Sequence, residues 1–147
     1  MKTLEDIAGE LGVSYLFEDW TRANIAMDGR RFADHPNGLP LVLDVLPVSG
    51  SVSVRNGIVR TTTERLVWFL DAIRMDSTTA EDASVGTRMM ELAKRFIAHV
   101  NASGDYERVN DAVWRAEYAL LDENVGGVCL EFSLTPIEGE CEYDLEQ

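Results

Sequence analysis

The stretch Ser51-Val-Ser-Val-Arg-Asn-Gly-Ile-Val-Arg-Thr61 decides the fold prediction for this chain. Two runs of residues flank Asn56-Gly57, a dipeptide that is a strong signal for a two-residue type I′ hairpin turn. Such a turn places Arg55 opposite Ile58 and Val54 opposite Val59. Residues that lie opposite each other share a face of the hairpin. We therefore predict one face lined by Val52, Val54 and Val59, and a polar face lined by Ser51, Ser53, Arg55 and Arg60.

Further strand signals lie on both sides of this hairpin. Arg65–Ile73 also fits a helix, but its Val67-Trp-Phe core favours a strand, and apolar residues on both faces predict a central one. For 113–121 the alternation of Trp114 with its polar neighbours suits a strand, while the spacing of the apolar residues from Val109 onward suits a helix. We expect strands over 13–20, 41–46, 65–73, 113–121 and 128–135, with 24–27 extending or pairing with the first; 28–40 is expected to be a loop and 122–127 a turn.

Two helices carry recognisable start and stop signals. Thr3-Leu-Glu-Asp6 resembles a capping box, an apolar stripe follows to Leu11, and Gly12 suits the position after a helix. Thr78-Thr-Ala-Glu81 is a second capping box. The apolar stripe that follows it runs to Val100, and Gly104 can end this helix after five to six turns.

The order of these elements predicts an α+β fold. Hairpin connections imply a largely antiparallel sheet with a projecting hairpin, a long helix packed on one face and a short N-terminal helix. Residues 1–137 are expected to form a single domain. Residues 138–147 are expected to form an acidic, frayed tail.

Composition narrows the class of protein. The chain has 147 residues, enough for one domain, and a net charge of −13. So acidic a chain disfavours binding to nucleic acid or to an anionic membrane surface. No apolar run approaches the roughly 18 residues of a membrane span, and the acidic N-terminus is not a secretory signal. Cys129 is expected to be buried and Cys141 exposed, without a disulfide.

No constellation of residues predicts catalysis, a metal or a cofactor. The sequence lacks the glycine-rich phosphate loops, the zinc-binding HExxH pattern and the nucleophile elbow. His35 lies in a turn, and His99 lies near the end of the long helix, where a histidine can favourably meet the helix dipole. The alternating acids of 138–144 lack the glycine and ligand order of an EF-hand. Trp20, Trp68 and Trp114 are expected in the core or at an interface.

Charge is distributed unevenly along the chain. Residues 101–147 hold twelve acidic and two basic residues, whereas residues 1–100 hold fourteen acidic and eleven basic ones. Eleven of the thirteen basic residues are arginine, the side chain favoured for pairing with carboxylates at interfaces. An arginine-bearing part and an acidic part could therefore attract each other between neighbouring copies.

The order of elements is similar to that of tail-terminator and tail-completion proteins of long-tailed bacteriophages. The stretches that carry this resemblance are Arg65-Leu-Val-Trp-Phe-Leu-Asp71, Thr87-Arg-Met-Met-Glu-Leu-Ala-Lys-Arg-Phe-Ile97 and Gly126-Gly-Val-Cys-Leu-Glu-Phe-Ser-Leu134. The resemblance covers roughly residues 1–135 at the level of pattern and includes no diagnostic motif. The resemblance does not place the 28–40 loop or the acidic tail.

The resemblance implies a structural protein without enzymatic activity or cofactor. Such proteins form rings, often hexameric, that cap the tail tube and join it to the head. The expected partners are further copies of the chain and other tail or connector proteins. The expected locations are the cytoplasm of the host bacterium during assembly and the virion. A ring needs two different patches that meet, and the candidates are Arg55, Arg60 and Arg65 on or beside the hairpin, and Glu131, Glu138 and Glu140 on the last strand and tail.

Two other classes of function stay open at this point. One is a small-molecule-binding or enzymatic domain with a pocket between the long helix and the sheet. The other is an acidic adaptor or inhibitor that binds a basic partner protein through residues 101–147. Self-association separates the ring from both.

Overall fold

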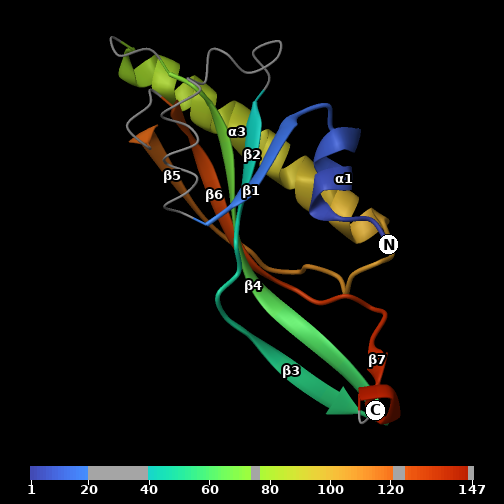
Figure 1. Ribbon diagram of the computed structural model, residues 1–147. Helices are drawn as coiled ribbons and strands as arrows, with labels where there is room; N and C mark the ends of the chain where they lie inside the picture. The colour runs from blue at the N-terminus through green and yellow to red at the C-terminus, as the bar shows by residue number, and fades with distance from the viewer. Residues whose placement is uncertain (20–39, 74–76, 121–124, 146–147) are drawn as a thin grey trace.

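The computed structural model describes residues 1–19, 40–73, 77–120 and 125–145 (Figure 1). Its sheet is mostly antiparallel, with one long helix and short helices, so the predicted α+β class is confirmed. The elements in chain order are α1 (Leu4–Glu10), β1 (Ser14–Glu18), β2 (Leu41–Val45), β3 (Gly50–Arg55), β4 (Ile58–Ala72), α3 (Thr79–Ala102), β5 (Val113–Leu120), β6 (Val125–Leu134), β7 (Glu140–Cys141) and α4 (Glu142–Leu145).

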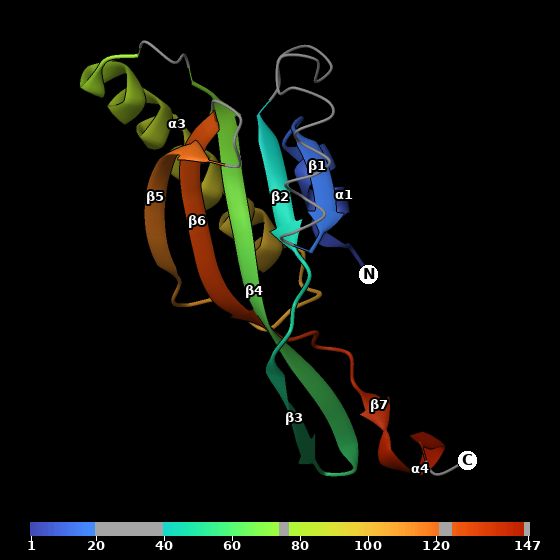
Figure 2. The same ribbon diagram turned by 60° about the vertical axis from the view of Figure 1, so that its left-hand side comes forward.

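The described strands form one seven-stranded sheet built around β4. Its main order is β1-β2-β4-β6-β5, and β3 and β7 also pair with β4. β1 and β2 are parallel, and every other pairing is antiparallel. Helices α1 and α3 lie on the same face of the sheet (Figures 1 and 2). We call the body of the molecule the part formed by α1, α3, β1, β2, β5, β6 and the second half of β4, residues 64–72.

The second half of β4 is buried on both faces. Val67 and Phe69 face the helices, and the Phe69 ring meets Phe96 of α3 edge-on with 5.3 Å between centroids. Trp68 and Leu70 face the opposite side, in a second buried cluster with residues of β2 and β6. The central strand expected over 65–73 is therefore confirmed, as is a strand rather than a helix over 113–120.

The hairpin register is confirmed pair by pair. Arg55 pairs with Ile58, Val54 with Val59 and Ser53 with Arg60. Asn56 and Gly57 have φ of 54° and 78°, the left-handed values that a type I′ turn requires at both positions. Both helix starts are confirmed as well, since the hydroxyls of Thr3 and Thr78 accept from the backbone three residues later.

The second hairpin strand and the central strand are one element. β4 runs for 15 residues without a break. Three consecutive threonines, 61–63, join the two parts, and such β-branched residues favour an uninterrupted strand. One strand therefore crosses the body and continues beyond it.

Two expectations for loops are wrong. The tail does not fray over 140–145, because β7 pairs with the start of β4 and α4 follows it. The expected turn at 122–127 ends early, since Val125-Gly-Gly127 already belongs to β6. A Cβ at Gly127 would overlap the carbonyl oxygen of Phe69, so this glycine permits close approach of two strands rather than a turn. The expected strand over 24–27 and loop over 28–39 lie outside the described residues, with Trp20 and His35.

Candidate functional site

The hairpin extends away from the body as an arm (Figures 1 and 2). We define the arm as β3, residues 58–63 of β4, β7 and α4. All six residues of β3 are exposed, and the two valines of its apolar face, Val52 and Val54, are 65% and 53% accessible. Isolated two-stranded hairpins are marginally stable in water, so an arm of this kind needs further support.

The C-terminal segment, residues 137–145, supplies that support. Cys141 pairs with Ile58 on the side of β4 opposite β3, and the Glu142 amide donates to the carbonyl of Gly57 (2.8 Å). Nearer the body, Arg60 Nε donates to the carbonyl of Ile137 (2.8 Å). The arm is therefore three-stranded near its tip, and its β3 side stays uncovered by any described residue.

The six candidate interface residues fall in three places. Arg55 and Arg60 lie on the hairpin, and Glu138 and Glu140 lie in the segment beside it. These arginines and acids, expected on separate surfaces, are neighbours within one copy. Attraction between copies through these four residues would compete with that arrangement.

Arg65 is not available for a subunit contact through its charge. Its guanidinium Nη2 lies 2.7 Å from both carboxylate oxygens of Asp44, and both side chains are largely buried. The Tyr15 hydroxyl donates to the same carboxylate. Burial first, and then this hydrogen bond, raise the pKa of Tyr15. The cluster ties β4 to β1 and β2 close to Thr63, where β4 leaves the body, so it anchors the root of the arm.

Glu131 lies on the body, far from the arm's tip. Its carboxylate is 3.5 Å from Arg115 Nη1, and the Arg115 guanidinium stacks over the ring of Trp68 (5.6 Å). Both charged side chains are about half exposed, so this pair contributes little stability. Glu131 thus forms a local contact on the face of the sheet opposite the helices.

The free side of β5 borders an apolar groove against α3. The groove holds about 290 Å³ and is walled by Trp114, which is 58% exposed. Tyr118, also exposed, lies over Gly86 of α3, where a Cβ would overlap its hydroxyl. The floor of the groove is formed by Met90, Ala93, Ile97, Val109 and Leu130. Trp114 is therefore a surface residue, whereas Trp68 is buried.

The described titratable groups form no evident catalytic set. No group of three or more His, Cys, Asp or Glu residues among them is placed to hold a metal ion. Cys129 is buried and Cys141 half-buried, both as free thiols; burial raises the pKa of Cys129 to about 12, so it stays protonated at neutral pH. His99 pairs with Glu10 of α1 (3.0 Å), near the helix end where it was expected.

Sequence reasoning missed Asp44 and the exposed side of β5. Asp44 is the one charge in the apolar run Leu41–Leu46, and a lone acid there signals a buried partner. No comparable signal marks Trp114, because the sequence does not show which strand lies at an edge of the sheet.

No protein-family model matches the chain, and no curated protein matches it significantly. No helix in the described part of the chain is long and apolar enough to cross a membrane.

Proposed function

We propose that this chain is a non-enzymatic structural protein of a phage or prophage tail, which self-associates into a ring at the junction of tail and head. The observation that carries the proposal is the arm. It holds two exposed valines on a strand with a free edge, and exposed apolar strand edges are typical of surfaces that pair with another chain.

The construction of the arm also supports assembly. The C-terminal segment stiffens the arm, and the Asp44–Arg65 pair anchors its root. A stiff arm loses less conformational entropy when a partner binds than a flexible loop does. The expected partners are further copies and other tail or connector proteins, in the host cytoplasm during assembly and in the virion, without a cofactor.

The test is the mass of the pure protein by light scattering after gel filtration, over a wide concentration range, with electron microscopy of the same fractions. The proposal predicts a discrete mass of several subunits and closed rings. A strict monomer at every concentration would contradict self-assembly.

A second candidate is a binding domain that uses the groove between α3 and β5. Its largely apolar lining and the exposed Trp114 favour this candidate, but among the described residues Lys94, Asn110 and Asp111 are the only polar ones that line the 290 Å³ groove. A monomer that binds a small apolar ligand with a change in tryptophan fluorescence would favour this candidate over the ring.

A further inference from the structure

Four of the described strands, β1, β3, β5 and β7, pair with a single neighbour each, and two of them, β3 and β5, lie in different parts of the molecule. Among the described strands, β3 pairs with β4 alone and β5 pairs with β6 alone. β5 lies at the side of the body, and β3 lies in the arm beyond the end of the body (Figures 1 and 2). The two edges of one copy therefore do not meet each other, and each can meet an edge of another copy.

The free edge of β3 presents unpaired backbone groups at defined positions. In a two-residue hairpin the pair next to the turn, here Arg55 and Ile58, exchanges both hydrogen bonds, and the bonding alternates from there. The N–H and C=O groups of Val52 and Val54 therefore point outward, away from β4. No hydrogen bond joins these outward groups to a described residue.

The side chains of the two edges match in their alternation. On β3, Val52 and Val54 share one face, and Ser53 and Arg55 share the other. On β5, Trp114, Ala116 and Tyr118 share the face toward α3, and Arg115 and Glu117 share the opposite face. When the two edges are aligned, the valines of β3 lie beside Trp114, Ala116 and Tyr118, on the face that borders the groove.

Charge and length also match. Arg55 and Glu117 are both exposed and form no ion pair with a described residue, whereas Arg115 is turned onto Trp68 and Glu131. β3 has six residues and β5 has eight, so at about 3.3 Å per residue β3 fits fully alongside β5. The stretch of β5 that pairs without irregularity, Val113–Tyr118, is also six residues long.

We propose that β3 of one copy adds as a strand to the free edge of β5 of the next copy, with Val52 and Val54 over Trp114 and with Arg55 facing Glu117. This inference rests on the self-association proposed above and names its two surfaces. The contact is head-to-tail, so each copy uses both edges and the chain of contacts closes into a ring or continues as a filament.

The first test is Val52→Pro, compared with Val52→Ala. Proline removes an outward N–H without removing a hydrogen bond to β4, whereas alanine removes the side chain and keeps the N–H. We expect Val52→Pro to abolish association in sedimentation velocity and Val52→Ala to weaken it less. Circular dichroism and limited proteolysis of the monomer check that the arm remains folded.

The second test exchanges charges between the two edges. Arg55→Glu and Glu117→Arg should each weaken association by about tenfold near physiological salt, because each places like charges at the contact. An equimolar mixture of the two variants should regain the wild-type mass, because every contact between unlike copies again joins opposite charges. A control mixture of Arg55→Glu with a variant that carries both Arg55→Glu and Arg95→Glu, the second change being at an exposed arginine of α3, should not regain it.

The outcomes separate this inference from the proposed function. If the wild type forms rings and Val52→Pro and both charge variants form them equally well, the inference is overturned while the ring function stands. If the wild type forms open filaments that these variants abolish, the strand pairing stands and the ring does not. A wild type that stays monomeric overturns both.

Discussion

The two halves of β4 show how one strand serves two purposes. From Val67 to Leu70 every side chain is buried and the strand has neighbours on both sides that belong to the body. From Ile58 to Thr63 the same strand carries side chains that are exposed or half-buried, and its neighbours are β3 and the C-terminal segment. The body half is held by burial, whereas the arm half supports β3, whose valines and free edge stay exposed. Changes in the two halves should therefore separate stability from assembly.

Truncation in the buried half should have the largest effect on stability. Phe69→Ala removes a fully buried ring that packs on Phe96, and such changes cost about 3–5 kcal/mol. Val54→Ala, the matched change on the arm, should alter the free energy of unfolding by less than about 0.5 kcal/mol because the side chain is exposed. Urea unfolding of both variants measures the difference. Equal losses would show that the arm and the body do not differ in this way.

The Asp44–Arg65 ion pair at the root of the arm should come next. Arg65→Met leaves the Asp44 carboxylate buried without its cation, and breaking a buried pair costs about 3–5 kcal/mol. The double variant Asp44→Leu with Arg65→Met removes both charges and should recover much of this loss. If the single and double variants are equally destabilised, packing rather than charge accounts for the contribution of this pair to stability.

High pH should weaken the same cluster through Tyr15. The folded protein holds the pKa of Tyr15 above its ordinary value of 10.0, through burial and then the bond to Asp44. The unfolded chain therefore loses the proton first, so this stabilisation is complete below about pH 10 and declines above it. Tyr15→Phe should be less stable than the wild type at pH 8, and the gap should narrow above pH 10. Urea unfolding across this range, with Tyr143→Phe on the arm as control, tests the assignment.

Removal of the C-terminal segment should have the smallest effect on the body. A chain ending at Ile137 loses β7 and α4, which pair with the arm only. We expect the free energy of unfolding to change by less than about 1 kcal/mol, because no buried core residue is lost. Proteolysis near the Asn56-Gly57 turn should become faster, because the hairpin loses its third strand. Unchanged cleavage would mean that β3 and β4 hold the arm alone.

Local chemistry made much of the fold predictable. Asn56-Gly57 sets both the turn and the register, because few other dipeptides tolerate positive φ at two positions. The capping threonines Thr3 and Thr78 mark helix starts because their hydroxyls satisfy backbone amides that lack a partner. These signals act within a few residues, so they can be read without tertiary structure.

Non-local pairing explains what could not be predicted. The segment Glu140–Cys141 has little intrinsic strand preference, and it forms β7 because the start of β4 offers a free edge beside it. The arginines and acids of the candidate site looked like separate patches because they are far apart in sequence, as the separation of 77 residues between Arg60 and Ile137 illustrates. Topology brings Arg60 and the segment after Ile137 together and takes Arg65 into the body.

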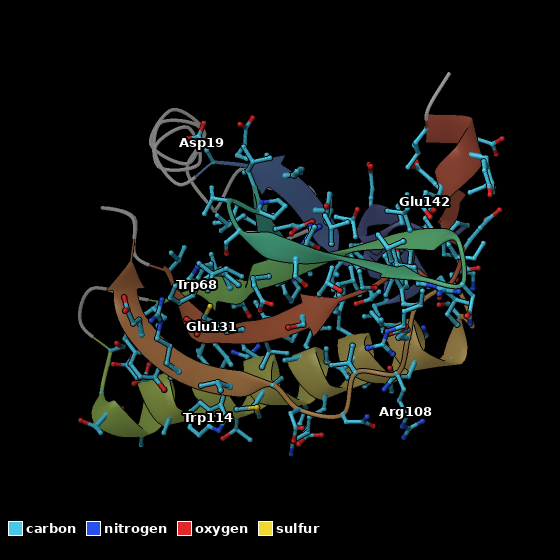
Figure 3. The ribbon with its side chains drawn as sticks, turned by 90° about the horizontal axis from the view of Figure 1, so that it is seen from below. Asp19, Trp68, Arg108, Trp114, Glu131 and Glu142 are labelled. Atoms are coloured by element: carbon cyan, nitrogen blue, oxygen red, sulfur yellow. The ribbon has the colours of Figure 1, made fainter. Side chains whose placement is uncertain are left out.

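Figure 3 shows the groove side of β5 and the C-terminal side of the arm. Trp114 and Glu142 lie on opposite sides of the molecule in this view, and Glu142 belongs to α4, on the side of β4 away from β3. A head-to-tail contact uses two different surfaces of each copy, and in the proposed contact these are the groove side of β5 and the free edge of β3.

Hydrogen exchange measured by mass spectrometry at low and high protein concentration tests the central claim most directly. Backbone amides that pair between copies become protected only when copies associate. The account predicts that protection rises together in peptides covering 50–55 and 113–118 as concentration increases, with the body strands β2 and β6 unchanged. Protection that rises elsewhere, or that does not depend on concentration in these two segments, would contradict it.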